Sequence, residues 1–490
     1  MIHSVKKIAV LFFIVLISGS CDDWLELLPP GGLIREEYWK NKEDVEAVLM
    51  SAYQKFAEID ENLFIFGEIR TYILKVDINQ PNREELLMES NIFPDNSICD
   101  WSEFYNIINK ANEVIKNAPL VQDVDNTFTD FEMRSNVAEA YFLRSLSYFY
   151  LVRIYRDVPL VLEPTETDDA EIYVSKSPEN VILDQIVTDL ENNRSFAPSG
   201  GFSTIKENKG RASKAAFDAL LADIELWRFN YEAVIRHVER IEQVEDIVLV
   251  PGNRWFEIYY PGNSLEGIFE LQFDGDLNQR NSLFGLTFRN SFRYDPSQKA
   301  LELFSTDYES AEIVRGPGTI VKEGEDDFNI WKYVGRAADG SSTRSGNETA
   351  SCNWIVYRLA DVMLMKAEAL AQLSRFQEAY DILAEIRTRA GMLPLSLSNN
   401  TITYEDAIME ERARELAYEG KRWFDLLRLG RRNNYQRKAT LIEVVVTNVP
   451  STQKRILSAK LTNPLGWYLP IYENEIERNK ELVQNPYYNF

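Results

Sequence analysis

The fold is decided by the stretch Glu411-Arg412-Ala413-Arg414-Glu415-Leu416-Ala417-Tyr418-Glu419-Gly420-Lys421-Arg422-Trp423-Phe424-Asp425-Leu426-Leu427-Arg428. Apolar and charged residues recur in it with helical spacing and Gly420 interrupts the pattern, so we expect helices over 405–419 and 422–430. The i,i+4 spacing of Glu411, Glu415 and Glu419 puts three carboxylates on one helical face.

The charged side chains of this stretch are predicted to form a buried or half-buried ion-pair network that joins the two helices, because buried charges persist when they are paired. The second helix is expected to pair its arginine side chains with the carboxylates of the first. Catalysis by the crowded carboxylates and contact with a protein partner are the alternatives. The predicted structural network comprises Glu411, Arg412, Glu415, Glu419, Arg422, Asp425 and Arg428.

Apolar residues keep a helical period through much of the rest of the chain. The pattern predicts helices over 43–56, 101–115, 136–155, 214–227, 231–242, 354–373 and 376–390. Ala367, Ala369 and Phe376 set small side chains against aromatic ones, as in tetratricopeptide-like helix pairs. No strict repeat register is present, so we expect helical hairpins rather than a regular solenoid.

The region from about 245 to 350 has a different texture, in which Gly, Asn, Asp and Arg alternate with short β-like runs such as 267–273. Long irregular segments in a compact protein are usually functional surfaces. We therefore expect a mainly α fold whose helical scaffold, 36–244 and 351–435, flanks a loop-rich, ligand-facing region with a few short strands. The tail, 436–490, is expected to be extended and packed by aromatic residues.

The first residues carry an export signal. Lys6 and Lys7 precede the apolar run 8–17, and small residues then lead directly into Cys21. This apolar run is too short to span a bilayer. We predict a lipoprotein signal peptide over 1–20, acylation of Cys21, a lipidated tether over 21–35 and a single domain over 36–490. An ordinary signal peptide, with Cys21 incidental, is the alternative.

Charge and composition exclude several classes of function. The formal net charge is −24 and becomes −26 once Lys6 and Lys7 leave with the signal, so nucleic-acid binding is not expected. Of two histidines only His237 remains in the mature chain. Zinc sites and Ser-His-Asp or Cys-His catalysis need a histidine among partners, so we predict no metal, no cofactor and no enzymatic activity. Acid–base catalysis by two carboxylates stays formally open.

The run 274–278, Asp-Gly-Asp-Leu-Asn, resembles the opening of a calcium-binding loop. Gln279 stands where such a loop needs glycine, and Gly285 stands where it needs a bidentate acid. An EF-hand is therefore excluded. A looser calcium site remains an alternative, with ligands from Glu323, Glu325, Asp326 or Asp327.

Blocks along nearly the whole chain resemble the SusD/RagB family of outer-membrane nutrient-binding lipoproteins. Two are highly characteristic: Tyr357-Arg358-Leu359-Ala360-Asp361 continuing to Ala369, and the run 411–428 quoted above. The other blocks occur along the chain in the order expected for the family. They lie at Tyr38-Trp39, Tyr105 with Ala111-Asn112, 138–145, Asp157-Val158-Pro159-Leu160, 210–216, 266–271, 387–391 and 484–487.

The resemblance implies a SusD-like helical fold with tetratricopeptide-like pairs as its scaffold. It also implies a partner, a SusC-like TonB-dependent β-barrel over which such proteins sit as a hinged lid. The expected protein is a glycan-binding lipoprotein of nutrient uptake, held in the outer membrane by lipid and facing the cell exterior, as Asp22-Asp23 after Cys21 also suggests. A peptide-binding RagB-like lipoprotein is the alternative, and a surface glycoside hydrolase or a purely structural scaffold is less favoured.

Carbohydrate sites combine flat apolar faces with polar groups that hydrogen-bond hydroxyls. The family's ligand loops carry no motif that transfers residue by residue, so the candidates rest on chemistry and position, near the first long helices and in the middle region. Trp255 and Trp423 are assigned to the core. The predicted ligand-binding residues are Trp101, Asn96, Arg289, Phe292, Arg293, Tyr294 and Trp331.

Overall fold

The computed structural model describes residues 38–71, 73–76, 82–165, 173–287, 293–308, 314–322, 328–337, 340–447, 449 and 451–489. Residues 41–490 form one compact unit and residues 1–40 another, of which only 38–40 are described. The predicted signal peptide, Cys21 and the tether over 21–35 therefore lie outside the described residues.

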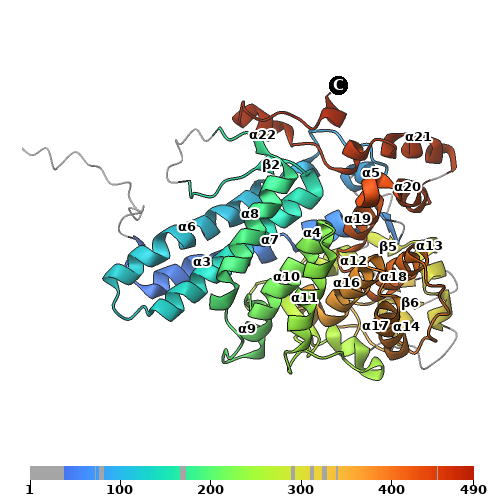
Figure 1. Ribbon diagram of the computed structural model, residues 1–490, viewed down its shortest axis with the longest axis horizontal. Helices are drawn as coiled ribbons and strands as arrows, with labels where there is room; N and C mark the ends of the chain where they lie inside the picture. Colours follow the sequence, from blue (N-terminus) through green and yellow to red (C-terminus); the bar gives the residue numbers. More distant parts are fainter. Residues whose placement is uncertain are drawn as a thin grey trace, which may run out of the picture. The chain divides into compact units, whose positions relative to one another are not determined.

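Three long helices of the unit 41–490 pack on one another, on the left of Figure 1. They are α3 (Lys42–Ala57), α6 (Ser102–Val124) and α7 (Asp130–Tyr155). Asn41 caps α3 and Thr129 caps α7, each in a reciprocal hydrogen-bond pair with the third helical residue. Such boxes satisfy backbone donors that the first turn leaves free, so both helix starts are sharply defined.

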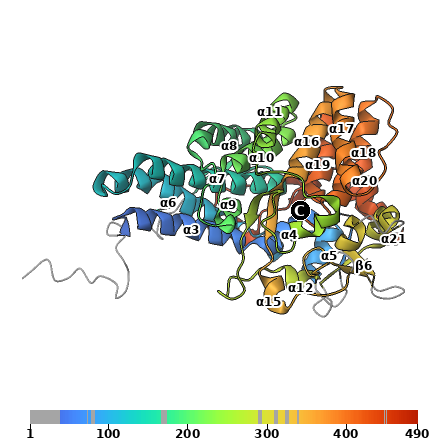
Figure 2. The same cartoon turned by 90° about the horizontal axis from the view of Figure 1, so that it is seen from below.

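Further helices pack as hairpins. α8 (Glu179–Asn193) lies on α7, and α10 (Lys214–Trp227) pairs with α11 (Tyr231–Glu242). Figure 2 shows α16 (Leu359–Gln372), α17 (Phe376–Arg389) and α18 (Thr401–Glu415) side by side, and α19 (Arg422–Tyr435) follows them. The predicted mainly α fold built from helix pairs is confirmed.

The middle region holds short strands and short helices, as its texture predicts. Its strands belong to two-stranded antiparallel sheets, in which β4 (Gly267–Leu271) pairs with β8 (Trp354–Arg358), β1 (Leu74–Val76) with β5 (Tyr294–Pro296), and β6 (Ile320–Lys322) with β7 (Phe328–Ile330). A fourth sheet joins β2 (Val158–Pro159) to β3 (Lys176–Ser177). The short helices there are α12 (Leu283–Thr287), α13 (Gln298–Leu303), α14 (Arg315–Thr319) and α15 (Gly346–Ala350).

Two predictions about elements are wrong. The segment 354–358 is a buried strand rather than the start of a helix, because its Trp-Ile-Val-Tyr-Arg run of aromatic and β-branched residues suits a strand. The tail is not extended throughout, since α20 (Lys438–Val446) and α21 (Ser451–Leu461) occupy its first half. Each of these helices buries apolar residues four apart, Leu441 with Val445 and Leu457 with Leu461.

Candidate functional site

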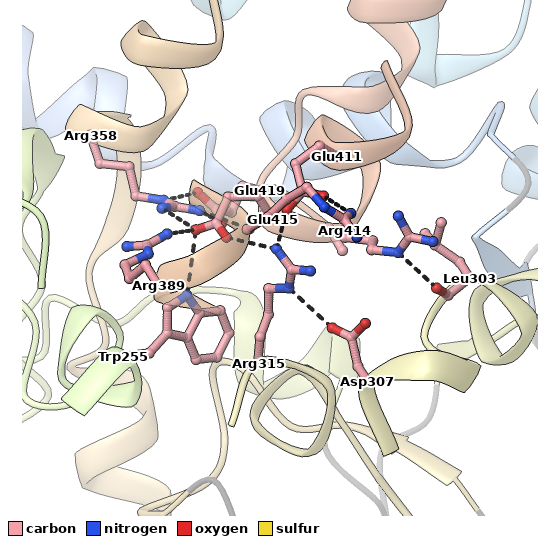
Figure 3. Close-up of polar contacts among 12 residues, drawn as sticks. Trp255, Leu303, Asp307, Arg315, Arg358, Arg389, Glu411, Arg414, Glu415 and Glu419 are labelled. Atoms are coloured by element: carbon pink, nitrogen blue, oxygen red, sulfur yellow. Dashed lines mark hydrogen bonds and ion pairs between the residues drawn. The ribbon is translucent and has the colours of Figure 1, made fainter. Parts of the chain in front are cut away.

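The charged run after residue 410 forms a buried network of ion pairs (Figure 3). The Glu415 carboxylate pairs with Arg358 (Oε1 to Nη1, 2.8 Å), Arg389, and Arg315 (Oε2 to Nη1, 3.2 Å). Arg315 also reaches Glu411 at 2.5 Å. Burial alone would raise the pKa of Glu415, but the guanidiniums of Arg389, Arg358 and Arg315 hold it well below its usual range. Glu415 is therefore a fixed anion rather than a proton donor.

The cations of this network come from elsewhere than the sequence predicts. The carboxylates at 411, 415 and 419 are paired by residues of the middle region and of 358–389, not by the helix that follows them. Glu419, which lies in the turn after α18, is bound by Lys332 and Arg358, each at 2.9 Å. Arg387 binds Glu411 at 2.9 Å. The acids thus tie the middle region to the helical scaffold.

Three of the remaining predicted members, Arg412, Asp425 and Arg428, form a second cluster. Arg412 bridges Asp361 and Asp425, each at 2.9 Å, and Arg428 bridges Asp425 and Glu368 at 2.9 and 2.7 Å. Arg422 donates to the Met409 carbonyl oxygen at 2.8 Å. The three clustered side chains are buried and paired, and Arg422 is buried against a backbone carbonyl, so the arrangement suits a structural role.

Two of the predicted ligand residues lie in the core. Trp101 is 2% exposed, and its Nε1 donates to Glu475 Oε2 at 3.1 Å. Trp331 is also 2% exposed, and its Nε1 donates to the Ala337 carbonyl oxygen at 2.5 Å. Neither ring offers a face to a sugar in this structure, which counts against both as stacking platforms.

Three other predicted residues come together beside α5 (Asn82–Met88). Asn96 donates from Nδ2 to the Arg83 carbonyl oxygen at 3.2 Å. Arg293 pairs with Glu84 of α5 and, at 2.7 Å, with Glu61 of α4 (Asp60–Glu68). Tyr294 is buried in β5. Arg289 and Phe292, the other two candidates, lie outside the described residues.

A cleft of about 600 Å³ lies between α3, α9 (Ile205–Gly210) and the chain that follows β4. Apolar side chains in its lining are Ala47, Met50 and Ala57 of α3 and Leu271 and Phe273 of the middle region. Ligand sites are commonly clefts of this size in which a few polar groups surround an apolar surface. Here the polar lining comprises Glu46, Ser51, Gln54, Glu58, Lys206, Glu207, Arg211, Gln272, Asn278, Gln279 and Arg280.

One wall of the cleft is held by a buried carboxylate. Arg211 makes two hydrogen bonds to Glu139, at 2.9 and 2.7 Å, and a longer one of 3.2 Å to Glu46. Tyr53 donates to Glu139 at 2.7 Å and accepts from the Ala212 backbone N–H at 2.9 Å. Burial raises the pKa of Tyr53 well above its usual range, so this hydroxyl stays neutral. Paired donors of this kind give the wall a fixed geometry.

The turn over 274–279 supplies another part of the lining, through Asn278 and Gln279. Asp274 Oδ1 accepts from the backbone N–H groups of Asp276 and Leu277 at 3.1 and 3.3 Å, and Asp274 N–H donates to the Gln279 carbonyl oxygen at 2.7 Å. The Asp-Gly-Asp-Leu-Asn run is therefore an Asx-type turn that presents Gln279 and Arg280 to the cleft. The acids of the looser calcium alternative lie outside the described residues, and no cluster of three or more metal-binding side chains occurs among those described.

Sequence reasoning placed ligand contacts in the middle region but missed the residues that line this cleft. They come from three segments far apart in the chain and share no spacing. Only the polar run Asn278-Gln279-Arg280, directly after a β-like segment, offered a local signal.

Two family models match the chain in succession. One, described as "Starch-binding associating with outer membrane", matches residues 23–226, and the other, described as "SusD family", matches residues 266–488. The chain belongs to the SusD-like family. The SusD-like protein P38 of Formosa agariphila is 26% identical to it, over 98% of this chain and 99% of that protein.

Solved structures share the fold. Surface glycan-binding protein A from Bacteroides uniformis superimposes on this SusD-like protein with a TM-score of 0.73 at 21% identity, covering 91% of this chain and 99% of that one. A laminarin-binding SusD-like protein gives 0.71 at 21% identity, with coverage of 91% and 99%. The part of the chain that is described includes no helix both long and apolar enough to span a bilayer.

Proposed function

We propose that this SusD-like protein binds an oligosaccharide at the cell surface and acts as the lid of a SusC-like TonB-dependent barrel in nutrient uptake. The observation that carries the proposal is the cleft, whose apolar lining and polar rim suit the mixed C–H and hydroxyl surface of a sugar. The middle region, expected to face the ligand, supplies one of its walls. Two structural neighbours have names that refer to glycan or laminarin binding, and these names point the same way.

Binding without turnover is part of the proposal. A glycosidase needs a carboxylic acid whose pKa is raised beside a second carboxylate. Burial raises the pKa of Glu139 in the cleft wall, but this carboxylate is fully buried and held by Arg211 and Tyr53. In the cleft lining, hydrogen bonds from Ser203 and Thr204 lower the pKa of Glu207. Glu46 is engaged by Arg211, and Glu58 by Lys55 at 2.6 Å. These contacts leave the carboxylates placed to accept hydrogen bonds from a ligand.

The membrane attachment is proposed to run through acylated Cys21, with the protein facing the cell exterior. Several acyl chains on one cysteine bind far more firmly than a single chain, so no membrane-spanning segment is needed. The partner barrel and the orientation rest on family membership. Arg293, at the edge beside α5, is retained as a proposed ligand contact, together with Asn96.

The test is native affinity electrophoresis of the mature protein in gels that contain soluble polysaccharides, with calorimetry on any glycan that retards it. Gln279→Ala with Arg280→Ala should abolish the retardation by removing polar groups from the rim, and Met50→Trp should abolish it by filling the cleft. The matched control is Arg254→Ala, because Arg254 is an exposed arginine that pairs with Glu257 on the same helical turn and does not line the cleft.

Three outcomes would contradict the proposal. Sugar release in the gel lanes would contradict binding without turnover. Retardation that survives the cleft variants but is lost in Arg293→Ala would move the site to the edge beside α5. No retardation by any glycan, combined with binding of oligopeptides, would favour the RagB-like alternative.

A further inference from the structure

The end of the α6–α7 hairpin carries three large apolar side chains that face solvent. Leu120 and Val124, one turn apart in the last residues of α6, are 57% and 67% exposed, and Phe131 in the first turn of α7 is 75% exposed. Single exposed apolar residues are ordinary on proteins, but these three lie on two helices that adjoin the same turn, which makes this end of the hairpin a candidate interaction surface. We call these three residues the hairpin tip.

The hairpin tip is rigid. The side chain of Thr129 caps α7 in a reciprocal pair with Glu132. Asp125 Oδ1 accepts from the backbone N–H of Thr127 at 2.8 Å and from its hydroxyl at 2.7 Å. Phe128 is 3% exposed and anchors the turn in the core. The exposure of the three apolar side chains therefore belongs to the folded structure and does not result from fraying of the helix ends.

The chain enters the unit 41–490 directly beside the hairpin tip. The backbone N–H of Lys42, the first residue of α3, donates to Asp125 Oδ2 at 3.0 Å. The ammonium of the same lysine pairs with Glu132 at 3.3 Å. Asp125 follows Val124 in the chain and Glu132 follows Phe131, so both contacts lie one residue away from the tip. Whatever segment precedes Asn41 is tied to this end of the molecule.

We propose that the hairpin tip inserts into the lipid surface of the membrane that holds the acylated Cys21. The inference rests on the lipid anchor proposed above. Cys21 lies 20 residues before Asn41, which an extended chain spans in at most about 70 Å. A patch this small binds lipid only weakly by itself, but the anchor raises its effective concentration at the surface.

A bilayer fits this position better than a soluble partner does. The 20 residues between Cys21 and Asn41 limit the distance from the anchor to this end of the body to at most about 70 Å, whether or not another protein is bound. Insertion of the tip would fix the orientation of the unit 41–490 on the membrane. The cleft is lined by α3, α9 and the middle region and includes none of the tip residues.

The experiment places an environment-sensitive fluorophore at the tip of the lipidated mature protein. Phe131→Cys supplies the attachment site, because Cys99 and Cys352 are buried and Cys21 is acylated. The protein is reconstituted in vesicles of phosphatidylethanolamine and phosphatidylglycerol that contain spin-labelled lipid. The matched control is Leu393→Cys, at a position that is 83% exposed after α17. We expect a blue shift and several-fold stronger quenching at position 131 than at position 393.

Equal emission and quenching at the two positions would overturn the proposal. A blue shift of the label at 131 in Cys21→Ser protein without vesicles, lost when residues 22–37 are deleted, would show that the tether covers the hairpin tip. That result would also overturn the proposal. A shift that requires an added barrel would assign the tip to that partner and likewise overturn a lipid contact. Retardation of the labelled protein by glycan tests the proposed binding, and mass spectrometry of Cys21 tests the lipid anchor. Failure of the proposed function can therefore be distinguished from failure of the lipid contact at the tip.

Discussion

At the scale of single residues, buried ion pairs connect segments that lie far apart in the sequence. Arg358 touches Glu266, Glu415 and Glu419, at 2.6, 2.8 and 2.9 Å, although it is 1% exposed. Its guanidinium thus connects the middle region to the end of α18. Each ion has given up its hydration, so removing one member leaves its partners buried without full compensation.

Removing one carboxylate from this set should destabilise the protein strongly. Glu415→Gln leaves Arg315, Arg358 and Arg389 buried with less compensating charge, so we expect a loss of about 3–5 kcal/mol in the free energy of unfolding. Urea titration followed by circular dichroism measures it. The control is Glu257→Gln, which breaks an exposed pair with Arg254 and should have little effect. Equal losses would show that the network is not stabilising.

Glu68 should make stability depend on pH. Its Oε1 accepts from the backbone N–H groups of Gly420 and Lys421, at 2.8 and 3.2 Å, and burial raises its pKa from 4.5 to about 8. Between these values the folded chain keeps a proton that the unfolded chain releases, so the free energy of unfolding falls as pH rises through this window.

Glu68→Gln removes this titration. Between about pH 4.5 and about 8, the free energy of unfolding of the wild type should fall by on the order of a few kcal/mol relative to that of the variant. Urea unfolding at several pH values gives the difference. Glu245→Gln, at an exposed position, is the control and should track the wild type. Parallel curves for the wild type and Glu68→Gln would refute the assignment.

At the scale of elements, α4 crosses the turn after α18 at a contact that leaves no room for a side chain. A Cβ on Gly67 would lie 2.0 Å from the Gly420 carbonyl oxygen, and Gly420 has a φ of +71°. The glycine that interrupts the charged run lies beyond the end of α18 at Glu415, and its role in the structure is to let α4 approach the backbone.

Gly67→Ala should force α4 away from this turn. We expect a loss at or above the upper end of the roughly 1–3 kcal/mol that overpacking usually costs, because the opposing atom is backbone and cannot rotate aside. Thermal or urea unfolding measures it. Gly285→Ala, where nothing lies within 4 Å of the added Cβ, should be close to neutral. A neutral Gly67→Ala would mean that α4 is free to shift.

Which elements could be predicted depended on how strong their local pattern is. The helices at 214–227 and 231–242 were predicted with the bounds that the structure gives to α10 and α11, because their apolar period is strong and Ser213 caps the first. The strand β8 was missed because a short apolar run fits either a strand or a helix until its partner, β4, is known.

At the scale of the whole molecule, attachment to the membrane should depend on one side chain. Cys21→Ala prevents acylation, so the protein should move from the outer-membrane fraction to the soluble fraction of cells that express it without its partner barrel. Immunoblots of the fractions measure this. The control is Cys99→Ala, which removes a buried thiol and should leave the protein in the membrane fraction. Retention of Cys21→Ala in the membrane would show that another contact holds it.

The sequence by itself determined the family, the helical class and the charged run that becomes the buried network, because these depend on short spacings that survive without tertiary information. Only the tertiary structure decided which cations pair with Glu411, Glu415 and Glu419. It also placed Trp101 and Trp331 in the core. The cleft between α3, α9 and the turn at 274–279 likewise appears only in the folded chain. The physical reason is that burial and pairing depend on which distant segments meet, and no local pattern carries that information.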